Sequence, residues 1–234
     1  MRMSEYDYSV AHWVDLFDKM HDSGIVVHHV SSEYDSYVLY MTVLNEFNLK
    51  YPEKQISHLV KLAEPHFDSS DFNPKLFQSK VEKYLTELNV SKLWGIQWMW
   101  RGDLKNESKR LDNFKKNIVI LNSRVLELKN NNLIDGFYLF SYTDSFCELA
   151  TTLLEQFDIS LFDGLTVYRN IQENEFDKYL DFFERNIIIR PLFAGKLETP
   201  HSKKQLVEYA LNHSRVTNGI ISISSIDKLN ELIN

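Results

Sequence analysis

Ile25-Val26-Val27-His28-His29-Val30 begins the pattern that decides the fold. This short run is rich in β-branched residues, an amphipathic stretch follows it at Tyr37–Leu49, and a second short run follows at Ile56–Ala63. Short runs of this composition are typical of strands that are buried on both faces. A strand, a helix and a second strand in this order form a right-handed βαβ unit, and such units build a parallel sheet.

The same alternation continues to the end of the chain. Further strands are predicted at Leu93–Trp100, Gly136–Ser141, Leu165–Tyr168, Asn186–Arg190 and Gly219–Ile223. Further helices are predicted at Val10–His21, Pro74–Leu88, Lys105–Asn130, Ser145–Gln156, Glu173–Glu184, Lys203–Asn212 and Ile226–Ile233. No linker-like stretch interrupts the pattern, so we expect one domain over residues 1–234.

The predicted elements favour an α/β fold of the TIM-type (β/α)8 barrel over an open doubly wound sheet. The sequence contains neither G-x-G-x-x-G nor G-x-x-x-x-G-K-[ST], the phosphate-binding motifs of open sheets. The first helix precedes the first strand, so the pattern holds eight helices but seven strands and lacks a first strand. This gap leaves open edges at Ile25–Val30 and Gly219–Ile223. We expect residues 1–8 to fill it irregularly, or a second copy of the chain to cover it in a homodimer.

The composition is mildly acidic and rich in apolar residues. The 26 Lys and Arg residues against 33 Asp and Glu residues give a net charge of −7, which argues against nucleic acids and anionic membranes as partners. With 44% hydrophobic residues the chain can form a large core, and no apolar run approaches the roughly 20 residues of a membrane span. The single cysteine, Cys147, excludes an internal disulfide and is expected to be buried. The polar start lacks a secretion signal, so we expect a cytoplasmic protein.

Three stretches carry the most specific motifs of the sequence. Ile187–Leu197 reads IIIRPLFAGKL, and Ala210–Leu229 contains a predicted helix, a predicted strand and the pair Ser224-Ser225. Gly24–Tyr34 leads from a predicted strand into a loop that ends in a tyrosine. In order and spacing, these stretches resemble the aldo/keto reductases over nearly the whole chain. The resemblance implies a barrel that reduces carbonyl compounds with NADP or NAD as cofactor.

The resemblance also implies four catalytic positions, of which this sequence keeps two. Tyr34 falls on the family's proton donor, and Lys61 falls on the lysine that lowers the pKa of this tyrosine. His29 stands where the family has an aspartate beside the lysine, and Met99 stands where it has a histidine that contacts the substrate oxygen. Methionine cannot donate that hydrogen bond, and a protonated His29 would add a like charge beside Lys61.

Cofactor-binding positions follow from the same resemblance. These positions are Ser141, Asn170, Arg190, Ser222, Ser224, Ser225 and Lys228. Ser141 and Asn170 match polar residues at the nicotinamide end, whereas Ser222 replaces a glycine of the final phosphate loop. Ser224-Ser225 precedes a predicted helix, whose N–H groups and dipole can bind phosphate, and Lys228 lies one turn into that helix.

Substrate-binding residues are expected at the C-terminal ends of the strands, where barrel enzymes carry their chemistry. These residues are Gln97, Trp98, Arg101 and Arg169. Strand alternation places Gln97, Met99 and Arg101 on one side of the strand and both Trp98 and Trp100 on the other. Arg101 either pairs with an anionic substrate or bonds to Asp103 or Glu107 at the surface. Arginines together with tryptophans near one opening suggest a polar or anionic, carbohydrate-related carbonyl compound.

Three hypotheses about function remain open at the level of sequence. The first is an NAD(P)-dependent oxidoreductase of aldo/keto reductase type with a divergent site, in which Glu33 or Asp35 could replace the missing carboxylate. The second is a non-catalytic barrel that binds a metabolite or a protein partner. The third is an enzyme that moves protons through His29 and Tyr34 without redox chemistry.

Overall fold

The computed structural model describes residues 3–140, 143–157, 161–195 and 199–233. Within these residues, seven strands form one parallel sheet in chain order. The strands are β1 (Val27–Val30), β2 (Ser57–Ala63), β3 (Gly95–Met99), β4 (Phe137–Phe140), β5 (Gly164–Tyr168), β6 (Asn186–Ile189) and β7 (Val216–Ile220). The helices are α1 (Val10–Asp22), α2 (Tyr37–Lys50), α3 (Pro74–Glu87), α4 (Glu107–Asn130), α5 (Asp144–Phe157), α6 (Asp177–Leu180), α7 (Lys203–Leu211) and α8 (Ile226–Ile233), with short 3-10 turns η1 (Met3–Glu5) and η2 (Phe193–Gly195).

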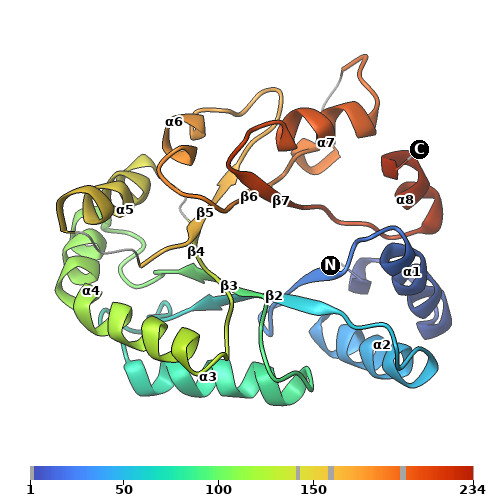
Figure 1. Cartoon of the computed structure of the whole chain (residues 1–234), viewed down its shortest axis with the longest axis horizontal. Helices are drawn as coiled ribbons and strands as arrows, with labels where there is room; N and C mark the ends of the chain where they lie inside the picture. Colours follow the sequence, from blue (N-terminus) through green and yellow to red (C-terminus); the bar gives the residue numbers. More distant parts are fainter. Residues whose placement is uncertain (1–2, 141–142, 158–160, 196–198, 234) are drawn as a thin grey trace.

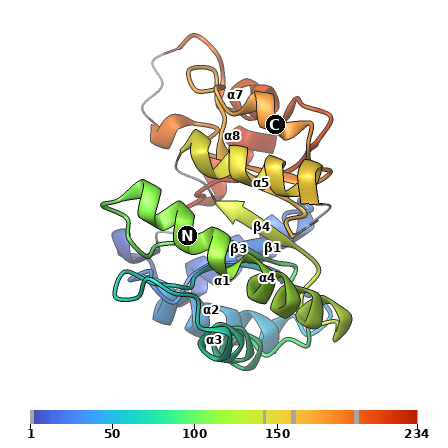
Figure 2. The same ribbon diagram turned by 90° about the vertical axis from the view of Figure 1, so that its left-hand side faces the viewer.

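The sheet forms a nearly closed barrel with the helices outside it, which confirms the predicted (β/α)8-type fold (Figure 1). Figure 2 shows α3, α4 and α5 along one side of the barrel. Parallel strands joined through helices on the outer face bring all C-terminal strand ends to one opening, the mouth of the barrel.

The barrel remains open between β1 and β7, as the missing first strand predicts. In the part of the chain that the structure describes, these two strands are the edges of the sheet, and residues 3–8 form the turn η1 and an irregular segment. Helices α1 and α8 pack against each other beside the gap (Figure 1). The predicted irregular start of the chain is therefore confirmed for the described residues.

Two predicted elements differ from the observed ones. The last strand lies at Val216–Ile220 rather than Gly219–Ile223, and its side chains alternate between half-buried and exposed. An alternating strand at the edge of a sheet has no continuous apolar run, whereas the residues that follow it are apolar and therefore resemble a strand in the sequence. The helix predicted at Glu173–Glu184 is shortened to α6 because the residues before it form turns around Asn170.

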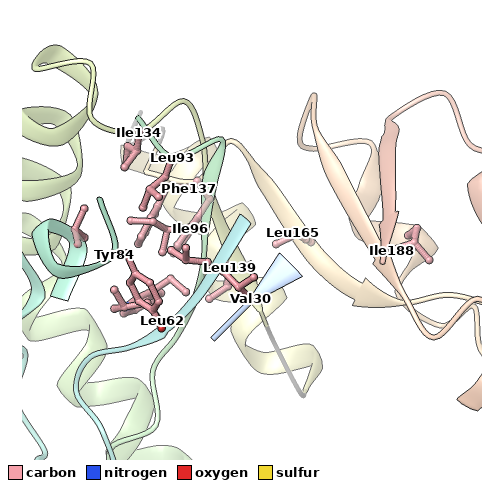
Figure 3. Close-up of a cluster of buried hydrophobic side chains, with 14 of the residues drawn as sticks. Val30, Leu62, Tyr84, Leu93, Ile96, Ile134, Phe137, Leu139, Leu165 and Ile188 are labelled. Atoms are coloured by element: carbon pink, nitrogen blue, oxygen red, sulfur yellow. The ribbon is translucent and has the colours of Figure 1, made fainter. Parts of the chain in front are cut away.

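The main core lies between the barrel and its helices. Val30, Leu62, Ile96, Leu139 and Leu165 project outward from neighbouring strands into this layer (Figure 3). Trp98 lies in the same layer, fully buried, with its ring against Phe114, Phe137 and Phe162. Cys147 is also fully buried in this layer, as predicted. Burial of these apolar side chains is the main force that holds the helices onto the barrel.

Buried histidines on β1 and β2 share one hydroxyl group in the helix-facing layer. Tyr40 of α2 lies with its OH 3.2 Å from His28 Nδ1 and 3.0 Å from His58 Nε2. Burial lowers the pKa of His28 to about 3 and that of His58 to about 4. Both rings are therefore neutral near pH 7, and His28 has the role of a core histidine.

The interior of the barrel is layered along its axis. Leu59, Tyr138 and Ile187 form an apolar cluster near the N-terminal strand ends, with Trp94 stacked on the ring of Tyr138. Gly136 permits this arrangement, because a Cβ there would lie 2.6 Å from the tyrosine ring. A second apolar cluster, composed of Ala63, Met99 and Phe140, lies at the last residues of their strands.

Candidate active site

Tyr34 and Lys61 come together at the mouth, as the resemblance implies. Tyr34 lies in the loop that follows β1, and Lys61 belongs to the neighbouring β2, with its side chain 15% exposed. The ammonium Nζ of Lys61 lies 5.2 Å from the centroid of the Tyr34 ring. A cation at this distance interacts favourably with the ring.

Glu33 brings a carboxylate to the same place. Its Oε2 lies 3.4 Å from Lys61 Nζ and 2.9 Å from Arg101 Nη1, and its Oε1 lies 3.2 Å from His66 Nε2. Arg101 follows β3, so Arg101 faces the mouth and pairs with Glu33 rather than with Asp103 or Glu107. The sequence offered either Glu33 or Asp35 as a carboxylate near Lys61, and the structure places Glu33 there.

Lys61 has an altered ionisation in this environment. Burial and the neighbouring Arg101 guanidinium lower the pKa of Lys61, whereas the Glu33 carboxylate acts in the opposite direction. Desolvation disfavours a charged ammonium, and a like charge adds to that effect. The charge state of Lys61 therefore depends on the balance between Arg101 and Glu33.

His29 lies inside the barrel and cannot act as the cation that the sequence suggested. Its Nε2 donates a hydrogen bond to Gln97 Oε1 at 3.0 Å, and its ring lies edge-on to Tyr34 with centroids 6.0 Å apart. Burial lowers the pKa of His29 to about 3. The ring is therefore neutral near pH 7, so it neither repels Lys61 nor replaces the charge of a carboxylate.

Met99 and Arg101 share one side of their strand, as the alternation predicted. The Nη2 atom of Arg101 lies 3.7 Å from Met99 Sδ, and its guanidinium lies 5.1 Å from the ring centroid of the half-exposed Phe67. Thioether sulfur is a weak acceptor, so Nη2 retains most of its capacity to bind an oxygen anion.

The loop after β2 contributes His66 and Phe67, which the sequence analysis did not select. The buried carboxylate of Glu64 supports this loop, since it pairs with Lys80 Nζ at 2.9 Å and accepts a hydrogen bond from the Asn73 amide at 3.3 Å. The Pro65 carbonyl accepts from the Arg101 amide at 3.1 Å. In the sequence, the only feature that could have indicated His66 and Phe67 as site residues is their position shortly after a predicted strand.

Three predicted site residues serve other purposes. Trp98 is not at the mouth: it faces the helices, and its Nε1 donates to the Glu64 carbonyl at 3.0 Å. Arg169 binds Asp177 at 2.8 Å and the carbonyl groups of α7, so its guanidinium joins two outer elements instead of facing a substrate. The side-chain amide of Asn170 is hydrogen-bonded within the protein. Its Nδ2 donates to Glu173 and to the Arg190 carbonyl, and its Oδ1 accepts from two backbone N–H groups of its own loop. In the structure, these three side chains therefore make their described contacts within the protein.

The loop between β7 and α8 has donors suited to a phosphate. Lys228 Nζ donates to Ser224 Oγ at 2.7 Å and lies 3.5 Å from the hydroxyl of Tyr6, while Ser225 Oγ accepts from the Lys228 amide at the start of α8. His12 of α1 contacts the Ser224 carbonyl at 3.2 Å. An ammonium, hydroxyl groups and the N–H groups of a helix start form a donor set that fits phosphate oxygens. Ser222 is exposed in the same loop.

The remaining cofactor predictions divide into two cases. Arg190 is exposed at the end of β6, and its guanidinium lies 4.5 Å from the Tyr168 ring centroid, so it remains available at the mouth. Ser141 lies outside the described residues.

Among the described residues, no group of three or more His, Cys, Asp or Glu side chains is arranged to hold a metal ion. In the same part of the chain, none of the helices combines the length and the apolar character needed to cross a bilayer.

Comparison with solved structures identifies barrels of the same type. The chain is similar to an aldo/keto reductase from Klebsiella pneumoniae in complex with NADP and acetate, with a TM-score of 0.69, 15% identity and coverage of 99% of this chain and 81% of that one. An aldo-keto reductase from Bacillus halodurans in its holo form gives a TM-score of 0.62 at 13% identity, with coverage of 97% and 81%. A thermostable aldo-keto reductase in complex with the inhibitor epalrestat gives 0.65 at 13% identity, with coverage of 97% and 82%.

These similarities concern the fold, and they agree with the resemblance found in the sequence. No protein-family model matches the chain. A comparison with curated proteins also finds no match. At identities of 13% to 15%, the shared feature is the barrel, so the chemistry of this site has to be argued from its own residues.

Proposed function

We propose that the chain is an oxidoreductase of aldo/keto reductase type that uses NADP or NAD to reduce an anionic or polar carbonyl compound. The observation that carries the proposal is the Lys61 ammonium 5.2 Å from the ring of Tyr34, at the mouth of a barrel similar to NADP-bound reductases. In this proposal Tyr34 is the proton donor and Lys61 stabilises the phenolate that remains after proton transfer.

The cofactor, when bound, supplies the hydride that adds to the carbonyl carbon. The oxygen of the former carbonyl takes the Tyr34 proton, and the phenolate recovers a proton from water, which balances the reduction to an alcohol. Lys228, Ser224 and Ser225 would hold cofactor phosphate groups, because their donors meet at the start of α8. Arg190 and Ser222 remain candidates for further cofactor contacts.

Arg101 supports an anionic substrate. Its side chain is 10% exposed, and its Nη2 has Met99 sulfur as a weak partner. A substrate carboxylate or phosphate that replaces this contact would gain a charge-assisted hydrogen bond. The tryptophans that suggested a carbohydrate face the helix layer, so the proposal extends only to an anionic or polar carbonyl compound.

A second candidate is a non-catalytic barrel that binds a metabolite or a protein partner. The observation that favours it is the replacement of two catalytic positions by His29 and Met99, together with the internal use of Asn170. The third hypothesis, proton transfer through His29, has lost support because a histidine with a pKa of about 3 is a weak base at neutral pH.

The test is a titration of the protein with NADPH and with NADH, followed by tryptophan and nicotinamide fluorescence. The proposal predicts saturable binding of at least one cofactor, and it predicts that Lys228→Gln weakens that binding at least about tenfold because a charge-assisted phosphate contact is lost. The control is Lys203→Gln, which removes an exposed lysine of α7 that pairs with Glu231. Absence of binding at millimolar concentrations of both cofactors would exclude the oxidoreductase and favour the second candidate.

Two further parts of the proposal concern the whole chain in the cell. We place the protein in the cytoplasm, and a fluorescent fusion at native expression level tests this location. A homodimer that covers the open edge between β1 and β7 is also proposed, and sedimentation velocity over a range of protein concentrations tests it, with a monomer at every concentration as the contrary result.

A further inference from the structure

We infer that Glu33 is the positioning carboxylate of this site, which holds Lys61 charged beside Tyr34 in place of the aspartate that β1 lacks. The inference rests on the proposed function for its catalytic meaning. Its structural part, the control of Lys61 ionisation by Glu33, can be measured without cofactor or substrate.

The geometry gives Glu33 contacts with three neighbouring parts of the mouth. One carboxylate oxygen contacts Lys61 of β2 at 3.4 Å and Arg101 after β3 at 2.9 Å, and the other contacts His66 in the loop after β2 at 3.2 Å. Glu33 itself belongs to the loop after β1. A single side chain thus links the ends of three consecutive strands, directly next to Tyr34 in the sequence.

The charges explain why a carboxylate is needed there. The Lys61 and Arg101 side chains are 15% and 10% exposed, so solvent screens their mutual repulsion only in part. Arginine keeps its proton under these conditions, and lysine is the group that loses one when two cations meet in a partly buried site. Without a counter-charge, Lys61 would tend toward its neutral form and its effect on Tyr34 would weaken.

Other groups around Lys61 do not supply that counter-charge. His29 faces it from β1 as a neutral ring that is hydrogen-bonded to Gln97. The Tyr34 ring faces it from the loop after β1, and Arg101 faces it as a second cation. Among the described contacts of Lys61, Glu33 is therefore the anion.

The unequal distances fit a positioning role. Arg101 takes the shorter contact with the shared oxygen, and Lys61 takes the longer one while its ammonium lies over the Tyr34 ring. Glu33 therefore neutralises part of the paired charge without drawing Lys61 away from the tyrosine. Its own side chain is 32% exposed, so its replacement removes little buried apolar surface and should leave the fold intact.

The experiment measures the pKa of Lys61 by NMR titration of its side-chain 13Cε resonance, assigned by its loss in Lys61→Arg. Glu33→Gln should lower the Lys61 pKa by about one unit or more, because an opposite charge within hydrogen-bond range is lost. Glu33→Asp should restore part of the shift. Asp35→Asn is the matched control, since Asp35 is an exposed carboxylate of the same loop, and it should leave the Lys61 pKa unchanged.

A Lys61 pKa in folded Glu33→Gln equal to that of the wild type would overturn the inference. If the glutamine variant fails to fold, Arg101→Gln provides the second measurement. This variant removes the neighbouring cation and keeps Glu33, so the Lys61 pKa should rise. An unchanged or lower Lys61 pKa would overturn the inference. Because no cofactor takes part, failure of cofactor binding leaves this result intact. If Glu33→Gln binds NADPH as the wild type does, its kcat separates the two explanations. A lower kcat at an unchanged KM for the cofactor indicates lost positioning of Lys61 and not a general structural defect.

Discussion

Arg101 is the residue whose replacement best tests whether the charged groups at the mouth bind a substrate or only stabilise the structure. Its guanidinium has two groups with different roles in the proposed site: Nη1 pairs with Glu33, and Nη2 lies beside Met99 sulfur. A substrate anion would use Nη2, and this contact would exist only for substrates that carry a charge in the correct place. A comparison of charged and neutral substrates therefore isolates this function.

Arg101→Gln should raise the KM for 4-carboxybenzaldehyde about tenfold or more, because a charge-assisted hydrogen bond contributes roughly 1.5–3 kcal/mol. The neutral analogue 4-formylbenzamide serves as the control, because loss of the Glu33 contact affects both substrates whereas loss of the anion contact affects only the first. Steady-state kinetics with NADPH give both KM values. Equal changes for the two aldehydes would show that Arg101 does not select an anion.

At this scale the sequence predicted the pair Tyr34 and Lys61, because the resemblance covers the strand and loop that carry them. It did not predict the direction of side chains at strand ends. Arg169 follows β5 directly, yet its guanidinium turns outward to the carbonyl groups of α7. Trp98 was placed among the substrate residues although alternation along its strand already assigned it to the opposite side from Arg101.

At the scale of elements, the histidines of β1 and β2 determine how the fold responds to acid. His28 and His58 are buried and His29 is half-buried inside the barrel, and their pKa values in the folded protein are about 3, 4 and 3 respectively. In the unfolded chain a histidine titrates near 6.5. Between these values the unfolded chain binds more protons than the folded protein, so acid favours unfolding.

The stability contributed by these neutral histidines is complete above about pH 6.5 and should decline as the pH falls toward 4. Each histidine contributes a slope of about 1.4 kcal/mol per pH unit to the free energy of unfolding in this window. Urea denaturation at several pH values between 7 and 4.5 measures the slope, and NMR titration of the ring 13Cε1 resonances checks the assignment. Rings that titrate near pH 6.5 in the folded protein, or a stability that does not change in this window, would contradict the prediction.

The elements themselves were predictable where their pattern was strong. The long amphipathic stretches became α1 to α5 with ends within two residues of the prediction, because each has a continuous apolar face toward the core. β7 was displaced because Thr217, Asn218 and Gly219 contain no apolar run, and its position depends on pairing with β6. Pairing of distant segments is a tertiary effect that a local window does not contain.

For the whole molecule, the alternation of strands and helices favoured the barrel and indicated a missing first strand, and the family resemblance supported the same fold. The structure adds how the gap is bordered, with α1 against α8 and Tyr6 beside Lys228 at the start of α8. The sequence named Glu33 and Arg101 as candidates, but it did not predict that they pair with each other, since this contact depends on loops that meet at the mouth. Glu33, Lys61 and Arg101 come from three consecutive βα units, whose strands β1, β2 and β3 pair side by side.

The most direct test of the central claim is the rate of NADPH oxidation with 4-carboxybenzaldehyde, measured for the wild-type protein and for Tyr34→Phe. A positioned general acid typically contributes a factor of about 100 to 10,000 to the rate. We expect turnover by the wild type and a kcat at least about 100-fold lower in Tyr34→Phe, with NADPH affinity unchanged. Equal turnover by the two proteins would contradict the assignment of Tyr34 as the proton donor and with it the proposed mechanism.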